Sequence, residues 1–311
     1  MSIFAQKNFM STNIYWPVYK NLESEIVVLS YNIHIDDKQL DVYSTKISDL
    51  ILRASAEIES ISKELYKSNG GSKTTKIKYD DDAIAHLDSL WKLEQKVVII
   101  SSSNCFQTNR ILQPFVKNET STFHGKQTFS WNNSYQNLKH DRGNSLPFGS
   151  VKYLFDIMSA LYVLNIYYKD ESFELENDGK ATSFPINLGS DLFSIKLHKH
   201  GGYDVNKGYL KKGDFDECIY FTKYTDEYYE KWRNDIIDTN KRLNEAAIKH
   251  PKFLEYVSKH GADAAVQAYS KSLYDIFTKE EWLNIIKSIP HNIQLYKGAQ
   301  YEAILNKDNV H

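Results

Sequence analysis

The fold is decided by residues 44–65, which have the sequence STKISDLILRASAEIESISKEL. Apolar side chains recur there at spacings of three and four, which places them on one face of an α-helix. Ser44 precedes the first of them with a hydroxyl that suits a helix N-cap. Gly70 and Gly71 follow the last of them with the backbone freedom that suits a helix end. We therefore predict a long amphipathic helix whose buried face carries Ile47, Leu50, Ile51, Ala54, Ile58, Ile61 and Leu65.

A second apolar segment, residues 148–168, predicts the helix against which the first one packs. Lys152 and Asp156 interrupt its apolar run, which indicates a buried helix and not a membrane span. Shorter helices are predicted after Pro17, over residues 82–94 and from Thr128 to about His140. We expect an N-terminal helical bundle with a core that includes Ile47, Leu50, Ile51, Ile58, Leu154, Phe155, Met158 and Leu161.

The sequence pattern changes after Tyr168. Residues 169–181 are charged and contain glycine, which predicts a linker or surface loop. Residues 184–198 and 217–224 alternate apolar and polar positions, which predicts strands. From Tyr228 onward the pattern is helical again, with breaks near Pro251, Gly261 and Pro290. The expected fold class is mainly α: a helical bundle over residues 1–174, then a smaller α+β region over residues 175–311.

Composition excludes several classes of protein. The chain has 311 residues, of which 41% are hydrophobic and 25% charged, and these are ordinary values for a globular protein. Its net charge of −2 supplies no global basic field, so contact with RNA needs a local basic patch. Cys105 and Cys218 stand too far apart to indicate a disulfide framework or a zinc knuckle. Met1 to Thr12 lacks the pattern of a signal peptide, so we expect a cytoplasmic protein without a membrane anchor.

The strongest candidate for chemistry is residues 137–142, NLKHDR, at the end of a predicted helix. The imidazole of His140 can take the proton from a 2′-hydroxyl of RNA or protonate the leaving oxygen. Arg142 and Lys139 can offset the charge that grows on the phosphorus centre. These residue types indicate metal-independent cleavage of RNA. The alternative is a purely structural helix end, where cations complement the helix dipole and Asp141 forms ion pairs.

The helix that begins after Ser44 also has a polar face, which carries Arg53, Glu57, Ser60 and Glu64. This face has two interpretations. It carries solvated side-chain pairs four residues apart, or it lines a groove opposite His140, where Glu57 or Glu59 orients the base.

Other polar motifs favour structural roles. The tract from His198 to His200 is typical of an exposed strand end, with metal or phosphate binding as the alternative. Ser101 to Ser103 beside Cys105 indicates a loop with a buried thiol. The chain has no GxxxxGK[ST] phosphate loop, HExxH metal helix or GxSxG nucleophile elbow.

The first half of the chain resembles a known family. The segment EIESISKELY (residues 57–66), the pattern Trp131-x-x-x-Tyr135-x-x-x-Lys139-His140-Asp141-Arg142 and the long apolar helix after it are similar to bacterial HEPN-like proteins. The resemblance covers roughly Tyr15 to Tyr168. It implies a helical bundle that is commonly dimeric, and for many members a ribonuclease of phage defence, abortive infection or toxin–antitoxin systems.

The resemblance implies a site and leaves its activity open. Its expected residues are His140, Arg142 and Lys139 as catalytic groups, with Asn137, Glu57 and Tyr135 in support. The family's motif places an arginine four to six residues before the histidine, whereas residues 135–139 contain none. The resemblance implies a metal-independent endoribonuclease without cofactors, and this is the function we expect. Because the arginine is missing, the alternative is a non-catalytic HEPN-like sensor or interaction module.

The expected partners follow from the same two interpretations. RNA is the expected substrate, and the resemblance together with 22 tyrosines suggests a homodimer that brings two His140 segments together. The C-terminal region is the expected contact for a protein partner.

Overall fold

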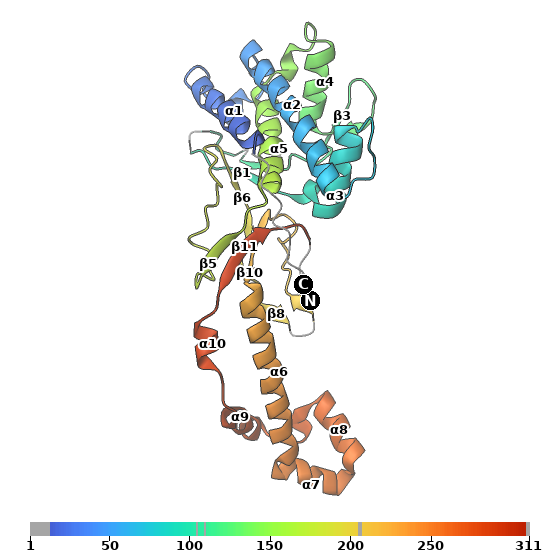
Figure 1. Ribbon diagram of the computed structural model, residues 1–311, viewed down its shortest axis with the longest axis vertical. Helices are drawn as coiled ribbons and strands as arrows, with labels where there is room; N and C mark the ends of the chain where they lie inside the picture. The colour runs from blue at the N-terminus through green and yellow to red at the C-terminus, as the bar shows by residue number, and fades with distance from the viewer. Residues whose placement is uncertain (1–12, 104, 109, 205–206, 309–311) are drawn as a thin grey trace.

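The computed structural model describes residues 13–103, 105–108, 110–204 and 207–308. The protein is elongated, with a helical bundle at one end, small sheets in the middle and a helical arm at the other end (Figure 1). Residues 1–12, where we expect no signal peptide, lie outside the described residues. The fold is mainly α with a smaller α+β region, as predicted.

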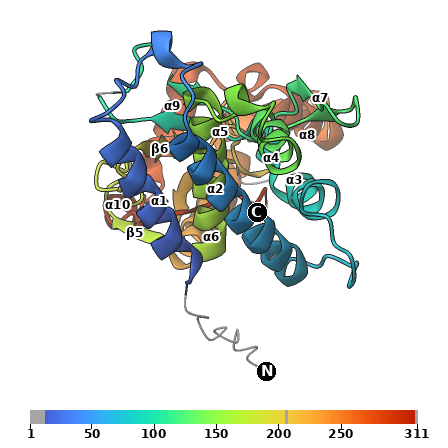
Figure 2. The same cartoon turned by 90° about the horizontal axis from the view of Figure 1, so that it is seen from above.

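The bundle is built around its most apolar helix. It comprises α1 (Tyr15–Leu29), α2 (Thr45–Ser68), α3 (Ala85–Trp91), α4 (Ser130–His140) and α5 (Val151–Lys169). α5 packs against α1, α2 and α4, and α1 and α2 run side by side (Figure 2). The hydroxyl of Ser44 caps α2 by accepting a hydrogen bond from the N–H of Ile47 at 3.1 Å. All eight predicted core side chains are at most 2% exposed, which confirms the expected core.

The helix predicted over residues 82–94 is divided into three pieces. A π-helical turn (Tyr79–Ile84) leads into α3, and a 3₁₀ turn (Leu93–Gln95) follows it. Lys92 ends α3 in the left-handed conformation, with φ of 53°. Further 3₁₀ turns cover Asp37–Gln39, Leu146–Phe148 and Leu273–Asp275.

Short strands form two sheets below the bundle. The first has the order β2-β1-β6, all antiparallel, and the second has the order β5-β11-β10-β7, in which only the β10–β7 pair of the described strands is parallel. Hairpins β3–β4 and β8–β9 stand apart from them. The bounds are β1 (Val98–Ile100), β2 (Ile111–Leu112), β3 (Glu119–Thr120), β4 (Gln127–Thr128), β5 (Phe173–Glu176), β6 (Phe193–Ile195), β7 (Leu197–His198), β8 (Tyr203–Asp204), β9 (Gly208–Tyr209), β10 (Tyr220–Tyr224) and β11 (Tyr301–Leu305).

The structure corrects part of the predicted C-terminal pattern. Residues 169–181 are not only a surface loop, because β5 lies within them and pairs with β11. Residues 184–192 form turns and not a strand, and Gly189 there has a φ of 86°. The strand β11 has no counterpart in the prediction.

One hydrophobic core joins the bundle to the sheets. The cluster that contains Leu161 of α5 also contains Phe193 of β6, Tyr220 of β10 and Leu305 of β11. The core therefore continues across residue 174, where the sequence suggested a division.

The arm is an insertion between the paired strands β10 and β11. It comprises α6 (Asp226–Lys249), α7 (Pro251–His260), α8 (Ala262–Lys271), α9 (Lys279–Ser288) and α10 (Ile293–Lys297). The predicted breaks at Pro251, Gly261 and Pro290 are confirmed. Its apolar cluster is separate from the main core. Throughout the described residues, no helix combines the length and the apolar character that crossing a bilayer requires.

Candidate functional site

The apolar face of α4 fixes the position of the candidate site. Trp131, Tyr135 and Leu138 are all buried, as their spacing predicts. The indole Nε1 of Trp131 donates to the carbonyl of Pro114 at 2.7 Å. With this face held in the bundle, the last turn of α4 carries Lys139 and His140 out to solvent.

The imidazole of His140 is positioned by an aromatic contact. Its ring meets the exposed ring of Phe123 edge to face, with centroids 5.8 Å apart. Phe123 belongs to the loop between β3 and β4, which also carries the exposed side chains of His124 and Lys126. No hydrogen bond joins the His140 imidazole to another described residue. Its ring nitrogens are therefore open to a ligand.

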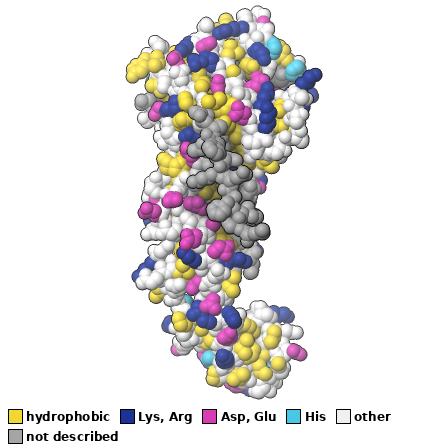
Figure 3. All heavy atoms as spheres, viewed as in Figure 1, with side chains coloured by type: hydrophobic (Ala, Val, Ile, Leu, Met, Phe, Trp, Pro, Cys, Tyr) yellow, Lys and Arg dark blue, Asp and Glu magenta, His cyan; other side chains and the backbone are white. Residues whose placement is uncertain are grey.

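Cations lie on both sides of His140 in the sequence. Lys139 Nζ lies 3.2 Å from the Tyr135 hydroxyl and 5.1 Å from the centre of the Tyr135 ring. Arg142 is exposed in the turn that follows α4. Asp141 accepts a hydrogen bond from Asn144 at 2.9 Å, and in the described part of the chain it forms no ion pair with either cation. Histidine and Lys or Arg side chains lie close together at the bundle end of the molecule (Figure 3).

Asn137 has a structural role next to this site. Its buried amide donates to the carbonyl of Asn133 at 2.8 Å and to the Thr122 hydroxyl at 2.7 Å. The side-chain oxygen of Asn133 in turn accepts from the Thr122 N–H at 3.2 Å. These bonds fasten the loop of Phe123 to α4, so Asn137 holds in place the aromatic ring that His140 contacts.

Glu57 lies on the face of α2 that also carries Arg53 and Ser60. Its neighbours along that face contact α1: Arg53 donates to Asn21 at 3.0 Å, and the Ser60 and Tyr15 hydroxyls lie 2.8 Å apart. Burial raises the pKa of Glu57, and Arg53 opposes the increase. The described contacts do not join Glu57 to His140. The three proposed catalytic residues thus lie at one exposed helix end, with Tyr135 beneath Lys139. Glu57 lies on the face of α2 from which Arg53 and Ser60 contact α1.

The sequence analysis did not single out the buried carboxylate of Glu23 on α1. Glu23 is fully buried, and one of its oxygens accepts from the Tyr19 hydroxyl at 2.9 Å and from the N–H of Asp191 at 3.0 Å. Lys20 Nζ lies 2.5 Å from the other oxygen. Tyr19 and Lys20 stand four and three residues before Glu23, so the sequence could have indicated that both side chains lie beside its carboxylate on one face of the helix. Its role is to attach the loop at Asp191 to α1.

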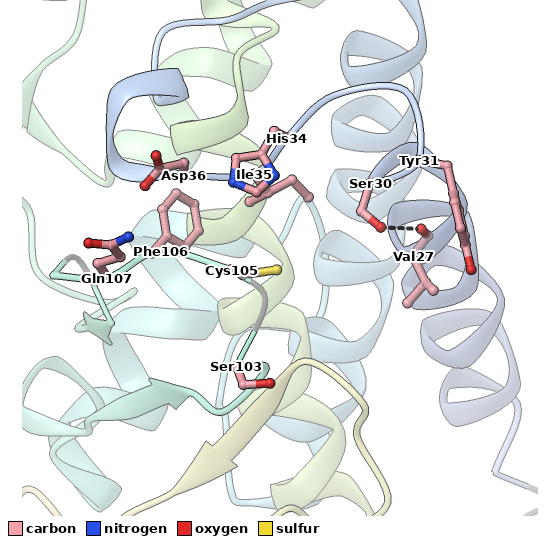
Figure 4. A pocket seen from close by; sticks show the side chains of 10 residues that line it. All are labelled: Val27, Ser30, Tyr31, His34, Ile35, Asp36, Ser103, Cys105, Phe106 and Gln107. Carbon is pink, nitrogen blue, oxygen red and sulfur yellow. Dashed lines mark hydrogen bonds between the residues drawn. The ribbon is translucent and has the colours of Figure 1, made fainter.

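A cavity of ≈ 570 Å³ lies at the end of α1. Ser103, Cys105 and Phe106 line one side of it, and His34 and Ile35 belong to the loop after α1 (Figure 4). Burial raises the pKa of Cys105, which keeps it a neutral thiol and agrees with the predicted buried role. None of the lining residues belongs to α4.

The tract from His198 to His200 is not an exposed strand end, contrary to the prediction. His198 is 2% exposed, and its Nδ1 lies 2.9 Å from a carboxylate oxygen of Asp214. His200 packs against Tyr224 and Tyr301, with ring centroids 4.5 and 5.3 Å away. Burial lowers the pKa of His200, which favours its neutral form. Tertiary pairing of β7 with β10 buries the ring of His198, and the aromatic contacts leave His200 half-buried.

Comparison with protein-family models, curated proteins and solved structures finds no match to this chain. Its function is therefore inferred from its own geometry.

Proposed function

We propose that the protein is a metal-independent endoribonuclease of the HEPN-like defence or toxin type, centred on the exposed end of α4. The observation that carries the proposal is the solvent-exposed imidazole of His140, which contacts the ring of Phe123 at the helix end that also carries Lys139 and leads to Arg142. Histidine changes charge within the physiological pH range, so it can act as either base or acid. The sequence resemblance supports the same centre.

The proposed reaction is an internal transesterification of RNA. His140 takes the proton of a 2′-hydroxyl, the 2′ oxygen forms a bond to phosphorus, and the bond from phosphorus to the 5′ oxygen breaks. The leaving oxygen takes a proton from an acid, for which His124 in the adjacent loop or His140 of a second copy is suited. Arg142 and Lys139 offset the charge on the phosphorus centre. The products are a 2′,3′-cyclic phosphate and a 5′-hydroxyl.

The test is cleavage of RNA by the purified full chain in EDTA. We expect 2′,3′-cyclic phosphate ends, and resistance of DNA and of RNA with a 2′-methoxy group at the scissile position. His140→Ala should abolish cleavage and relieve growth arrest on expression. Arg142→Ala should weaken it by roughly 10²-fold or more, and Arg142→Lys should restore part of it because the charge returns without the bidentate grip.

The matched control is His291→Ala, because His291 is an exposed histidine on the arm. This variant should cleave RNA like the wild type. Absence of cleavage by the wild type, together with harmless expression, would refute the nuclease.

That outcome would favour the second candidate, a non-catalytic interaction module. Apolar side chains exposed on the arm support this alternative: Leu254 is 55% exposed, Val266 62% and Ile293 60%. Both candidates are compatible with a homodimer, in which the nuclease would bring two His140 segments together. Sedimentation showing a strict monomer at high concentration would exclude that shared-cleft arrangement.

A further inference from the structure

A histidine, a carboxylate and a thiol meet beside the second sheet, away from α4 in the sequence. The imidazole of His198, a carboxylate oxygen of Asp214 and the sulfur of Cys218 all lie within 4.8 Å of one another. His198 and Cys218 are buried, and the side chain of Asp214 is 46% exposed. The cluster is thus enclosed on the protein side and open to solvent at the carboxylate.

Backbone turns bring these groups together. The N–H of Glu217 donates to the carbonyl of Asp214, and the N–H of Cys218 donates to the carbonyl of Phe215, both at 3.2 Å. These consecutive turns place Asp214 and Cys218 near each other. Parallel pairing of β7 with β10 sets His198 opposite Phe221, three residues after Cys218. The fold itself assembles the cluster.

The surroundings of the cluster are preorganised. The ring of Phe215 meets that of His198 edge to face at 5.2 Å. The buried Lys96 Nζ donates to the carbonyls of Asp216 at 2.9 Å and Cys218 at 3.1 Å, which fixes the turn. Lys196 Nζ lies 2.5 Å from a carboxylate oxygen of Glu217 and 3.8 Å from the Oδ2 of Asp214, so its closer ion pair is with Glu217.

The imidazole meets the carboxylate through one of its two nitrogens. The Nδ1 of His198 lies 2.9 Å from the Oδ1 of Asp214, so Nδ1 is the atom that faces the cluster. The Nε2 projects from another edge of the ring, where it is buried without a hydrogen-bond partner among the described residues.

We propose that His198, Asp214 and Cys218 bind a divalent metal ion of the Zn²⁺ class, with solvent as the fourth ligand. Imidazole, carboxylate and thiolate are the ligands that Zn²⁺ takes in proteins, at distances of about 2.0–2.3 Å. Such bonds place neighbouring ligand atoms about 3–4 Å apart, so only small side-chain movements are needed to close the site. Binding releases the thiol proton to solvent. The metal goes beyond the proposed function, since it lies outside the α4 site and takes no part in RNA cleavage.

The test uses the full-length protein, stripped with EDTA and titrated with Co²⁺ as a spectroscopic substitute for Zn²⁺. We expect one Co²⁺ per chain, with a thiolate-to-metal charge-transfer band in the near ultraviolet. Zn²⁺ should displace Co²⁺ and raise the melting temperature. Cys218→Ser should abolish the band, and Asp214→Asn should weaken binding at least about tenfold, since even groups that only orient a ligand cost this much.

Matched controls separate the site from nonspecific binding. Cys105→Ala removes the other buried thiol, and Asp216→Asn removes a carboxylate two residues from Asp214 that pairs with Lys92. Both should bind Co²⁺ like the wild type. Asp214→Asn alters a part-exposed side chain, so it tests the site even if Cys218→Ser fails to fold. A wild type without the thiolate band, or a band lost in Cys105→Ala and kept in Cys218→Ser, would overturn the proposal.

Discussion

Glu23 and Lys96 are charged side chains that lie at least 99% inside the protein. Such charges persist only where hydrogen bonds replace the lost water. Glu23 receives those bonds from α1 and from Asp191, and Lys96 gives them to the carbonyls of Asp216 and Cys218. Burial lowers the pKa of Lys96 to about 8. Glu23 therefore holds the loop at Asp191 against α1, and Lys96 holds the turn that contains Asp216 and Cys218.

We expect Glu23→Ala to destabilise the protein by ~3–5 kcal/mol, because it leaves buried donors such as the N–H of Asp191 without their acceptor. The matched control is Glu25→Ala, two residues further on the same helix. Glu25 pairs with Lys46 at the surface, where a solvent-exposed ion pair contributes little to stability. Urea unfolding of the three proteins measures the difference. An equal decrease in the free energy of unfolding of the two variants would contradict the role of Glu23 in attaching the loop at Asp191 to α1.

At the scale of elements, α4 and the β3–β4 hairpin form one unit through Asn133 and Asn137. We expect Asn137→Ala to cost ~1–3 kcal/mol, because the Thr122 hydroxyl loses its partner and a buried amide is removed. Amide hydrogen exchange should rise in residues 119–128. If the α4 site cleaves RNA, cleavage should fall although His140 is intact. Asn144→Ala, at an exposed turn, is the control and should change neither exchange nor cleavage.

Periodicity along the chain predicted the long helices because their signal is local. The spacing in residues 44–65 and 148–168 needs no knowledge of the partner helix, and both helices form as expected. Strands of two to five residues carry little local signal. The strand β11 pairs with β5 and β10, which lie far away in the sequence, so its formation depends on tertiary contacts. That dependence explains why it was not predicted.

The candidate sites follow the same logic. His140 and its neighbouring cations are adjacent in the sequence, so their grouping could be predicted. Asn137 was expected to support the site, and its amide donates hydrogen bonds to the Thr122 hydroxyl and the Asn133 carbonyl, which the sequence does not reveal. Asp214 and Cys218 stand four residues apart, but His198 joins them only through the pairing of β7 with β10. A pattern search along the chain does not detect such a group.

At the scale of the whole molecule, the arm and the bundle are joined through a narrow base. β10 leads into α6, and α10 leads back into β11, with Tyr224 paired opposite Tyr301. Aromatic rings of α6 pack there, including Tyr228 against Tyr224 at 4.7 Å. The arm has an apolar cluster of its own, consisting of Ala247, Phe253, Ala265, Ile276, Phe277 and Ile285. We infer that the arm unfolds as a separate unit.

Phe277→Ala tests this independence. Phe277 is 1% exposed, so its truncation should cost the arm ~3–5 kcal/mol. Trp282 contacts it at a ring distance of 5.8 Å and reports on the arm by fluorescence once the other tryptophans are replaced by Phe. We expect the Trp282 transition to move to lower urea. Far-ultraviolet circular dichroism, which reports the helices of both parts, should then show a second transition at the original midpoint, that of the bundle.

Phe193→Ala is the reciprocal control, because Phe193 lies in the core that the bundle shares with the sheets. It should lower the bundle transition and leave the Trp282 transition in place. A truncation in a core destabilises the whole cooperative unit that contains it and leaves other units unchanged. If either variant shifts both transitions together, the arm and the bundle unfold as one cooperative unit although their apolar clusters are distinct.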